Sequence, residues 1–232
     1  GDRWGETIKK LNAHGNDILR REGYFSPRGD IRYTASAGPS RLVDIDVADS
    51  EIYSVLDAKR GRIFTYNGDG HLMYVFGGLG NKRGEFNTPV AIERIGDDFL
   101  VLDKALGEIT LFQVTEYGST LNEAVRSYYR GDEERAVELF RRAVDMNANL
   151  EFAYSGIGKA LLRQGKYAEA MQYFKLSMDQ RNYSKAFQLR RKEVLREYLP
   201  AVLSAAMAVT AGLLLLRKLK KLLRRKGAAT VE

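Results

Sequence analysis

Hydrophobic and polar positions alternate through the middle of the chain, roughly from residue 38 to residue 116. Short apolar runs in this region are separated by turn residues, of which "NGDG" at 67–70 is the clearest case. Alternation with a period of two is typical of strands that have one buried face. The pattern therefore predicts strands at 42–47, 51–56, 61–66, 71–76, 90–95, 98–102 and 108–114.

Two of these segments are copies of each other. The stretch "YSVLDAKRGRIFTY" from residue 53 aligns with "FLVLDKALGEITLF" from residue 99, at a constant offset of 46 residues. Asp57 and Asp103 occupy the same place in the two copies, which suggests a repeated hydrogen bond in a turn. Strand repeats with this period are typical of β-propeller blades.

The stretch "FGGLGNKRGEFNTPVAI" at 76–92 resembles the glycine-rich start of an NHL-repeat blade, and the paired "VLD" segments resemble its middle. The resemblance covers roughly residues 38–114 and implies two blades of an NHL-type propeller at 38–116. Closed propellers use roughly four to eight blades. We therefore expect the missing blades on another segment, N-terminal to Gly1, or on another chain.

After residue 117 the pattern changes to a helical one with an offset of 34 residues, which relates Gly131 to Gly165 and Phe140 to Phe174. The second copy, "AYSGIGKALLRQGKYAEAMQYFKLSM", resembles a tetratricopeptide repeat. The residues that carry this resemblance are Tyr154, Gly158, Gly165, Tyr167, Ala170 and Phe174. We expect two such repeats at 117–182, in which small residues let paired helices approach closely and Phe174 fills the gap between pairs.

Helices are also predicted on both sides of the repeats. Residues 1–37 are predicted to form an amphipathic helix, weakened at Gly15, and a connecting loop. Residues 183–198 are predicted to cap the helical array, with Phe187, Val194 and Leu195 facing inward. Pro200 should interrupt or bend the chain just after this cap.

Residues 199–216 contain no charged side chain, and eighteen apolar residues are about the minimum for a helix that crosses a bilayer. A buried soluble helix and a helix lying flat on the membrane are the alternatives, but no polar face is present. Ser204, Ala208 and Gly212 would form a small-residue face suited to a second membrane helix.

The tail at 217–232 is strongly basic. Basic residues beside a span tend to stay in the cytoplasm and also attract anionic lipids. The preceding chain would then lie outside the cytoplasmic membrane. The residues that carry this expectation are Arg217, Lys218, Lys220, Lys221, Arg224, Arg225 and Lys226.

Composition excludes several classes of function. The net charge of +7 comes mostly from this tail, because the rest of the chain has 30 basic and 29 acidic residues, and we expect no nucleic-acid partner. Cysteine is absent, and the two histidines, His14 and His71, are far apart in sequence. We expect no catalytic residue, metal or cofactor. The acidic pair Asp44 and Asp46 shares one strand face, which we interpret as solvated.

The sequence thus predicts a multidomain β + α protein: a partial propeller, tetratricopeptide hairpins and one transmembrane helix. The leading hypothesis is a non-catalytic, membrane-anchored accessory protein of a bacterial membrane complex, with a carbohydrate ABC importer as the specific expectation. One alternative is a propeller hydrolase or lactonase with its active site in the missing blades. Another alternative is a tail-anchored cytosolic adaptor.

Overall fold

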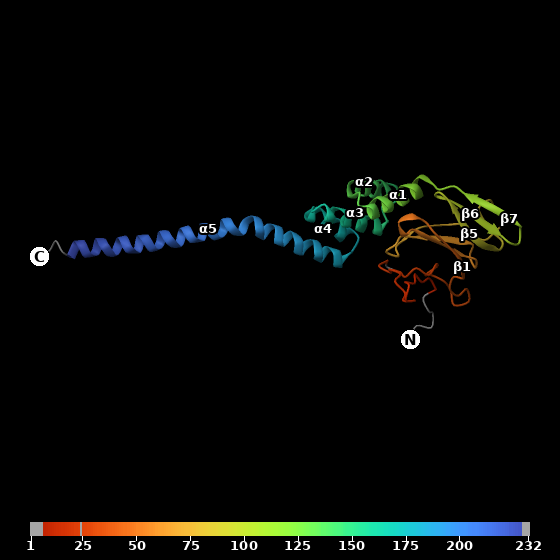
Figure 1. Ribbon diagram of the computed structural model, residues 1–232, viewed down its shortest axis with the longest axis horizontal. Coiled ribbons are helices and arrows are strands. Elements are labelled where there is room, and N and C mark those ends of the chain that lie inside the picture. Colours follow the sequence, from red (N-terminus) through yellow and green to blue (C-terminus); the bar gives the residue numbers. More distant parts are fainter. Residues whose placement is uncertain (1–6, 24, 229–232) are drawn as a thin grey trace.

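The computed structural model describes residues 7–23 and 25–228, with side chains placed up to residue 218. Two small antiparallel sheets come first and α-helices follow, the last of which is very long. Figure 1 shows the sheets at one end, the helices α1 to α4 beside them, and α5 projecting away from the rest. The chain is therefore a mixed β and α protein with a folded body and one extended arm.

Each sheet is a meander in which strands follow one another in sequence order. The first contains β1 (Leu42–Val47), β2 (Tyr53–Asp57), β3 (Arg62–Tyr66) and β4 (Leu72–Phe76). The second contains β5 (Pro89–Ile95), β6 (Asp98–Asp103) and β7 (Glu108–Phe112). All seven predicted strands are confirmed. β7 is an edge strand, because it pairs with β6 alone, and the sheets form no closed ring within the described residues.

The repeated aspartates have the structural role predicted for them. Asp57 Oδ1 accepts the backbone N–H groups of Lys59 and Arg41, each at 2.9 Å. Asp103 is equally buried and accepts backbone N–H groups from the loop before β5 and from the turn after β6. Burial alone would raise the pKa of Asp103, but these donors outweigh it and lower that pKa.

The two sheets pack against each other, and the acidic pair on β1 lies in this interface. Asp44 Oδ2 accepts the backbone N–H of Ile92 at 2.8 Å. Asp46 forms an ion pair with Arg94 at 2.8 Å, in which both side chains are nearly buried. The shared face is confirmed, but the interpretation as a solvated face is wrong, because β5 covers it. The apolar contacts between the sheets involve Leu56, Ile63, Phe86, Ile92, Phe99 and Val101.

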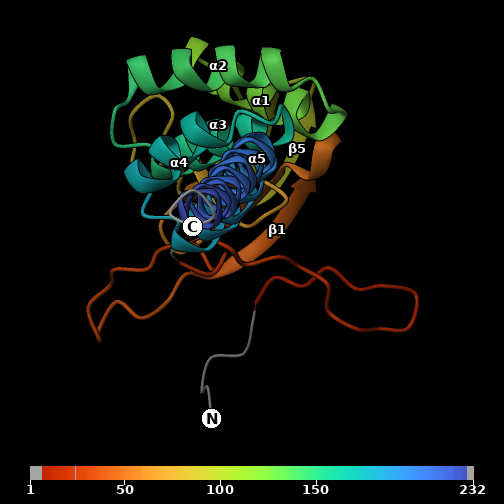
Figure 2. The same ribbon diagram turned by 90° about the vertical axis from the view of Figure 1, so that its left-hand side faces the viewer.

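The helix predicted near the N-terminus is wrong for the described residues. Residues 7–23 are irregular, with a turn in which the Asn12 side chain accepts two backbone N–H groups and with an isolated bridge between Leu11 and Asp17. Ile8 and Leu19 instead cover the free face of the first sheet. Figure 2 shows the segment passing beside β1, away from α1 and α2. Turn chemistry and packing on the sheet prevail here over a weak helical period; Trp4 lies outside the described residues.

Four helices of the body pack in sequence: α1 (Glu116–Arg130), α2 (Glu133–Met146), α3 (Glu151–Arg163) and α4 (Tyr167–Leu176). The close contact between α3 and α4 requires a glycine on α3. A Cβ atom on Gly158 would stand 2.6 Å from Cε1 of Phe174, which is fully buried. Gly165 ends the α3–α4 turn at a φ of +77°, a conformation that glycine adopts easily.

The last helix, α5 (Gln180–Ala228), tests two expectations, a break or bend at Pro200 and a cap with three inward-facing apolar residues. It passes Pro200 as one helix, so the expected interruption is wrong, but its ribbon bends partway along its length, as a proline inside a helix favours (Figure 1). Its start packs on α4 through the fully buried Ala186. Phe187, Val194 and Leu195 are about half exposed, so the prediction that they face inward is wrong. Ala186 makes the contact with α4 instead, because α5 lies close against the other helices only at its beginning.

A charged cleft between the first sheet and the helices

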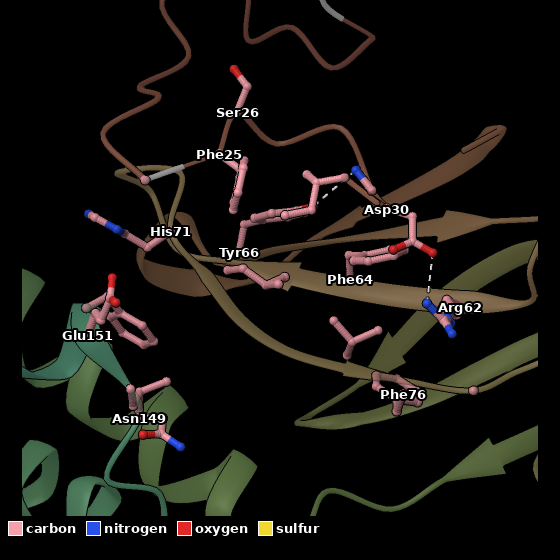
Figure 3. A pocket seen from close by; sticks show the side chains of 18 residues that line it. Phe25, Ser26, Asp30, Arg62, Phe64, Tyr66, His71, Phe76, Asn149 and Glu151 are labelled. Carbon is pink, nitrogen blue, oxygen red and sulfur yellow. Dashed lines mark hydrogen bonds and ion pairs between the residues drawn. The ribbon is translucent and has the colours of Figure 1, made fainter. Parts of the chain in front are cut away.

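A cleft lies where the N-terminal segment, the β3–β4 turn and the start of α3 meet. Two cavities, of about 580 and 830 Å³, share His71, Glu151 and Phe152 in their walls. Figure 3 shows the first cavity, with Phe25 and Ser26 above it, strand residues beneath it, and Asn149 and Glu151 on the helical side. All three parts of the body therefore contribute to one concave surface.

The first cavity has an apolar floor and a polar edge. Phe64 and Tyr66 of β3 and Phe76 of β4 line the floor. Burial raises the pKa of Tyr66 to about 12, although its hydroxyl oxygen accepts the backbone N–H of Gly29 at 3.2 Å. At the edge, Asp30 pairs with Arg62 at 2.8 Å (Figure 3). This part of the cleft suits a ligand with an apolar group and a polar end.

Local turn chemistry places the polar residues of the second cavity. The Asn67 side chain accepts the backbone N–H groups of Asp69 and His71, which closes the predicted "NGDG" turn. The backbone N–H of Glu22 donates to the Asp69 carbonyl at 2.8 Å, so the N-terminal segment lies directly against the turn. A Cβ atom on Gly70 would stand 2.5 Å from the Arg20 carbonyl, so only glycine permits this approach.

Lys159 of α3 lies at the centre of the charges in the cleft. Its Nζ atom is 2.9 Å from Asp69 Oδ2 and 3.3 Å from Glu22 Oε2. Arg20 approaches the other oxygen of Asp69 at 3.0 Å. Burial alone would raise the pKa of Asp69, but Lys159 and Arg20 outweigh it and lower that pKa. Asp69 conversely raises the pKa of Lys159 against the effect of burial. Lys159 is thus a charged cross-link, not a free amine.

His71 lies beside this ion pair and stacks on Phe152, with ring centroids 6.0 Å apart. Burial has the largest effect on the pKa of His71 and lowers it, and the positive charge of Lys159 lowers that pKa further. Its side chain is therefore held in the neutral form at neutral pH. Near it, Ser155 Oγ donates to Asp179 Oδ2 at 2.8 Å, which joins α3 to the segment before α5.

Glu22, Asp69 and His71 have ligand atoms within 4.8 Å of one another, which is compatible with a metal site. The ammonium group of Lys159 already lies between the two carboxylates, however, so a divalent cation would have to displace it. We assign no metal to this cluster. Its ion pairs join the first sheet to the helices, and its open sides can contact a ligand or a partner.

The residues predicted from tetratricopeptide resemblance lie away from the walls of these cavities. Ala170 and Phe174 are fully buried between helices, and Gly158 packs on Phe174. Tyr154 Oη donates to the Ala148 carbonyl at 3.1 Å, while Tyr167 begins α4. Ala170 and Phe174 thus belong to the helical core, Tyr154 and Tyr167 are partly buried at its edge, and the cleft is built by other residues.

The predicted membrane residues all lie on α5. Ser204, Ala208 and Gly212 are spaced by four on one continuous helix and therefore share a face. Arg217 and Lys218 are exposed at the end of the region with placed side chains. The helix includes the remaining basic positions, but their side chains lie outside the described part: Lys220, Lys221, Arg224, Arg225 and Lys226.

Among the described residues, α5 is the one helix that is long and apolar enough to cross a membrane by length and composition. None of the apolar window is buried against the body. Met207 and Leu215, for example, are 65% and 67% exposed.

No protein-family model matches the sequence, and no curated protein matches it significantly.

Proposed function

We propose that the protein is a membrane-anchored, non-catalytic interaction module. In this account the span of α5 fixes it in a bilayer, and the sheets and helices of the body bind a partner protein. The observation that carries the proposal is the exposed apolar stretch of α5, continuous with the part of the same helix that packs on α4. An anchor joined to the body without a break holds the body at a defined place near the membrane.

The proposed anchor is supported by the energetics of apolar surface. A fully buried apolar side chain gains about 1.5–3 kcal/mol relative to an exposed one. Residues 199–216 leave many such side chains exposed, including Val202, Leu203 and Leu214. A bilayer supplies the apolar surroundings that the body does not. Backbone groups inside a helix are hydrogen bonded to each other, as the hydrocarbon region requires.

The basic positions from Arg217 onward favour a cytoplasmic C-terminus, by the positive-inside rule. The body would then lie outside the cytoplasmic membrane, near the head groups. A tail-anchored cytosolic protein is the opposite arrangement of the same elements, and measured topology decides between them.

The proposed partner is a membrane or extracytoplasmic protein. The resemblance of the strand repeats to NHL blades and of the helices to tetratricopeptide repeats supports this class, since both kinds of repeat offer binding surfaces. The cleft around His71 adds a concave surface with apolar and charged walls. A carbohydrate ABC importer is the specific candidate, and it rests on the resemblance alone.

Co-purification tests the proposal. The protein is extracted from native membranes in mild detergent, and the partner is identified by mass spectrometry. Gly212→Leu enlarges the small-residue face of α5 and should reduce recovery of the partner several-fold, because a second helix could no longer approach closely. Ala206→Leu is the matched control, because it lies on the opposite side of the helix and should leave recovery unchanged. Equal recovery with both variants would contradict docking through this face.

A further inference from the structure

The two sheets have the same strand register, which lets each position of one be matched to a position of the other. On the first sheet, Asp44, Leu56 and Ile63 lie opposite one another in a row across β1, β2 and β3. The corresponding row on the second sheet crosses β5, β6 and β7 and consists of Ala91, Leu102 and Ile109. The next row is Asp46, Ser54 and Thr65 in the first sheet and Glu93, Leu100 and Leu111 in the second.

Matched positions differ sharply in burial. Leu56 and Ile63 are 0% exposed, because the second sheet covers their face. Their counterparts Leu102 and Ile109 are 39% and 65% exposed, and Leu111 is 54% exposed. The second sheet thus repeats a face that is covered in the first sheet and leaves it uncovered. We call the face that carries these residues and Glu93 the outer face.

The charged residues at matched positions indicate which side chains a covering sheet must carry. On the first sheet Asp46 binds Arg94 of the covering sheet, and Ser54 Oγ lies 2.7 Å from the same guanidinium. Arg94 also lies over the Phe99 ring, 4.1 Å from its centroid. Glu93 occupies the place of Asp46 on the outer face. It is exposed and makes no hydrogen bond or ion pair with any described residue.

We propose that the outer face is the docking surface for a β-sheet of a partner protein. The partner's sheet presents an apolar face to the outer face, just as the second sheet presents Phe99 and Val101 to the first sheet. It also carries an arginine or lysine opposite Glu93. The proposal rests on the interaction function proposed above and names the kind of partner surface. The negative charge of Glu93, at the place where Asp46 pairs with Arg94 in the first sheet, favours a sheet with a basic residue over unspecific apolar contact.

A second copy of this chain is a poorer occupant. The face of its second sheet that has the required chemistry is covered by its own first sheet. The other face of its first sheet is covered by Ile8 and Leu19 over β2 and β3, and the residues of β1 that stay exposed there, Val43, Ile45 and Val47, include no cation. Neither surface therefore combines an open apolar sheet face with the basic side chain required opposite Glu93.

Site-specific cross-linking tests the proposal in the full chain in native membranes. The chain has no cysteine, so Leu111→Cys can be labelled selectively with a benzophenone maleimide and irradiated. We expect an adduct with another polypeptide whose cross-linked peptide has alternating apolar residues and a basic residue. Combining the label with Glu93→Arg should lower the adduct yield at least tenfold, since like charges would then meet. Glu108→Arg is the matched control on exposed β7 and should retain the yield.

A charge exchange completes the test. Replacing the identified basic residue of the partner by glutamate should restore the adduct in the Glu93→Arg background. An adduct with a second copy of this chain, no adduct, or a yield unaffected by Glu93→Arg would overturn the proposal. Thermal unfolding by circular dichroism verifies that each variant is folded. Co-purification that still depends on Gly212 would show that the proposed function survives the loss of this docking surface.

Discussion

The two sheets are built alike but are treated differently by the rest of the chain. The first sheet is covered by the second sheet on one face and, over β2 and β3, by the N-terminal segment on the other, where β1 and β4 keep exposed apolar side chains. The second sheet is covered on one face, and its matched apolar positions are exposed. The comparison shows that repeated sequence produces repeated strands, whereas the burial of a sheet face depends on whether another segment of the chain packs on it. An exposed copy of a buried face therefore marks a surface that can bind a partner.

The largest expected effect is a difference in unfolding free energy between substitutions at matched leucines of the two sheets. Leu56→Ala removes a fully buried side chain and should lower the free energy of unfolding by about 2–5 kcal/mol, because it leaves a cavity. Leu102→Ala at the matched position should cost less than about 1 kcal/mol, because that side chain already contacts solvent. Urea unfolding of the detergent-solubilised protein measures both. Equal losses would contradict the difference in coverage.

The ion pairs that join the sheets to the helices give an intermediate effect. Lys159→Met leaves the nearly buried Asp69 without its closest cation and should cost about 1–3 kcal/mol of unfolding free energy. Arg126→Met is the counterpart beside the second sheet, where Arg126 pairs with Asp97 at the β5–β6 turn. It should cost less, because Asp97 is more exposed than Asp69. The same unfolding assay ranks the two variants, and the reverse order would contradict this account.

The smallest expected effect is a loss of stability at acid pH, caused by His71 immediately before β4 in the first sheet. The folded state lowers the pKa of His71 from its ordinary value of 6.5, so the unfolded state binds a proton first as the pH falls. Stability should therefore decrease below about pH 6.5, by about 1.4 kcal/mol for each unit of pKa difference. His71→Phe keeps an aromatic ring against Phe152 and should flatten the profile between pH 6.5 and 5. An unchanged profile would show that His71 is not held neutral in the folded state.

Sequence reasoning was most successful for the strands. The alternation and the turn residues are local signals, so all seven strands were predicted close to their observed ends, and the roles of Asp57 and Asp103 followed from their repetition. The register match that exposes Glu93 needed the observed strand pairing. It could not be read from the offset of 46 alone, because β1 and β5 are related by a shift of one further residue.

The failures have physical causes in tertiary packing. The N-terminal segment has near-helical spacing, but Ile8 and Leu19 gain more by covering a sheet face than one short helix would supply. The cap prediction erred because α5 leaves the body soon after Ala186. The charged cleft joins Glu22, Asp69 and Lys159, whose separations along the chain reach 137 residues. No sequence spacing predicts that contact, although a lysine between the small buried residues Gly158 and Ala160 is a usable signal.

The most direct test of the membrane-anchored interaction module is its topology in living cells. Glu134→Cys on the exposed side of α2 and Ala228→Cys at the end of α5 are clean reporters in a chain without cysteine. We predict that a membrane-impermeant maleimide labels Glu134→Cys in intact bacterial cells and labels Ala228→Cys only after permeabilisation. Labelling of neither position until the cells are opened, or release of the protein from washed membranes, would contradict the account.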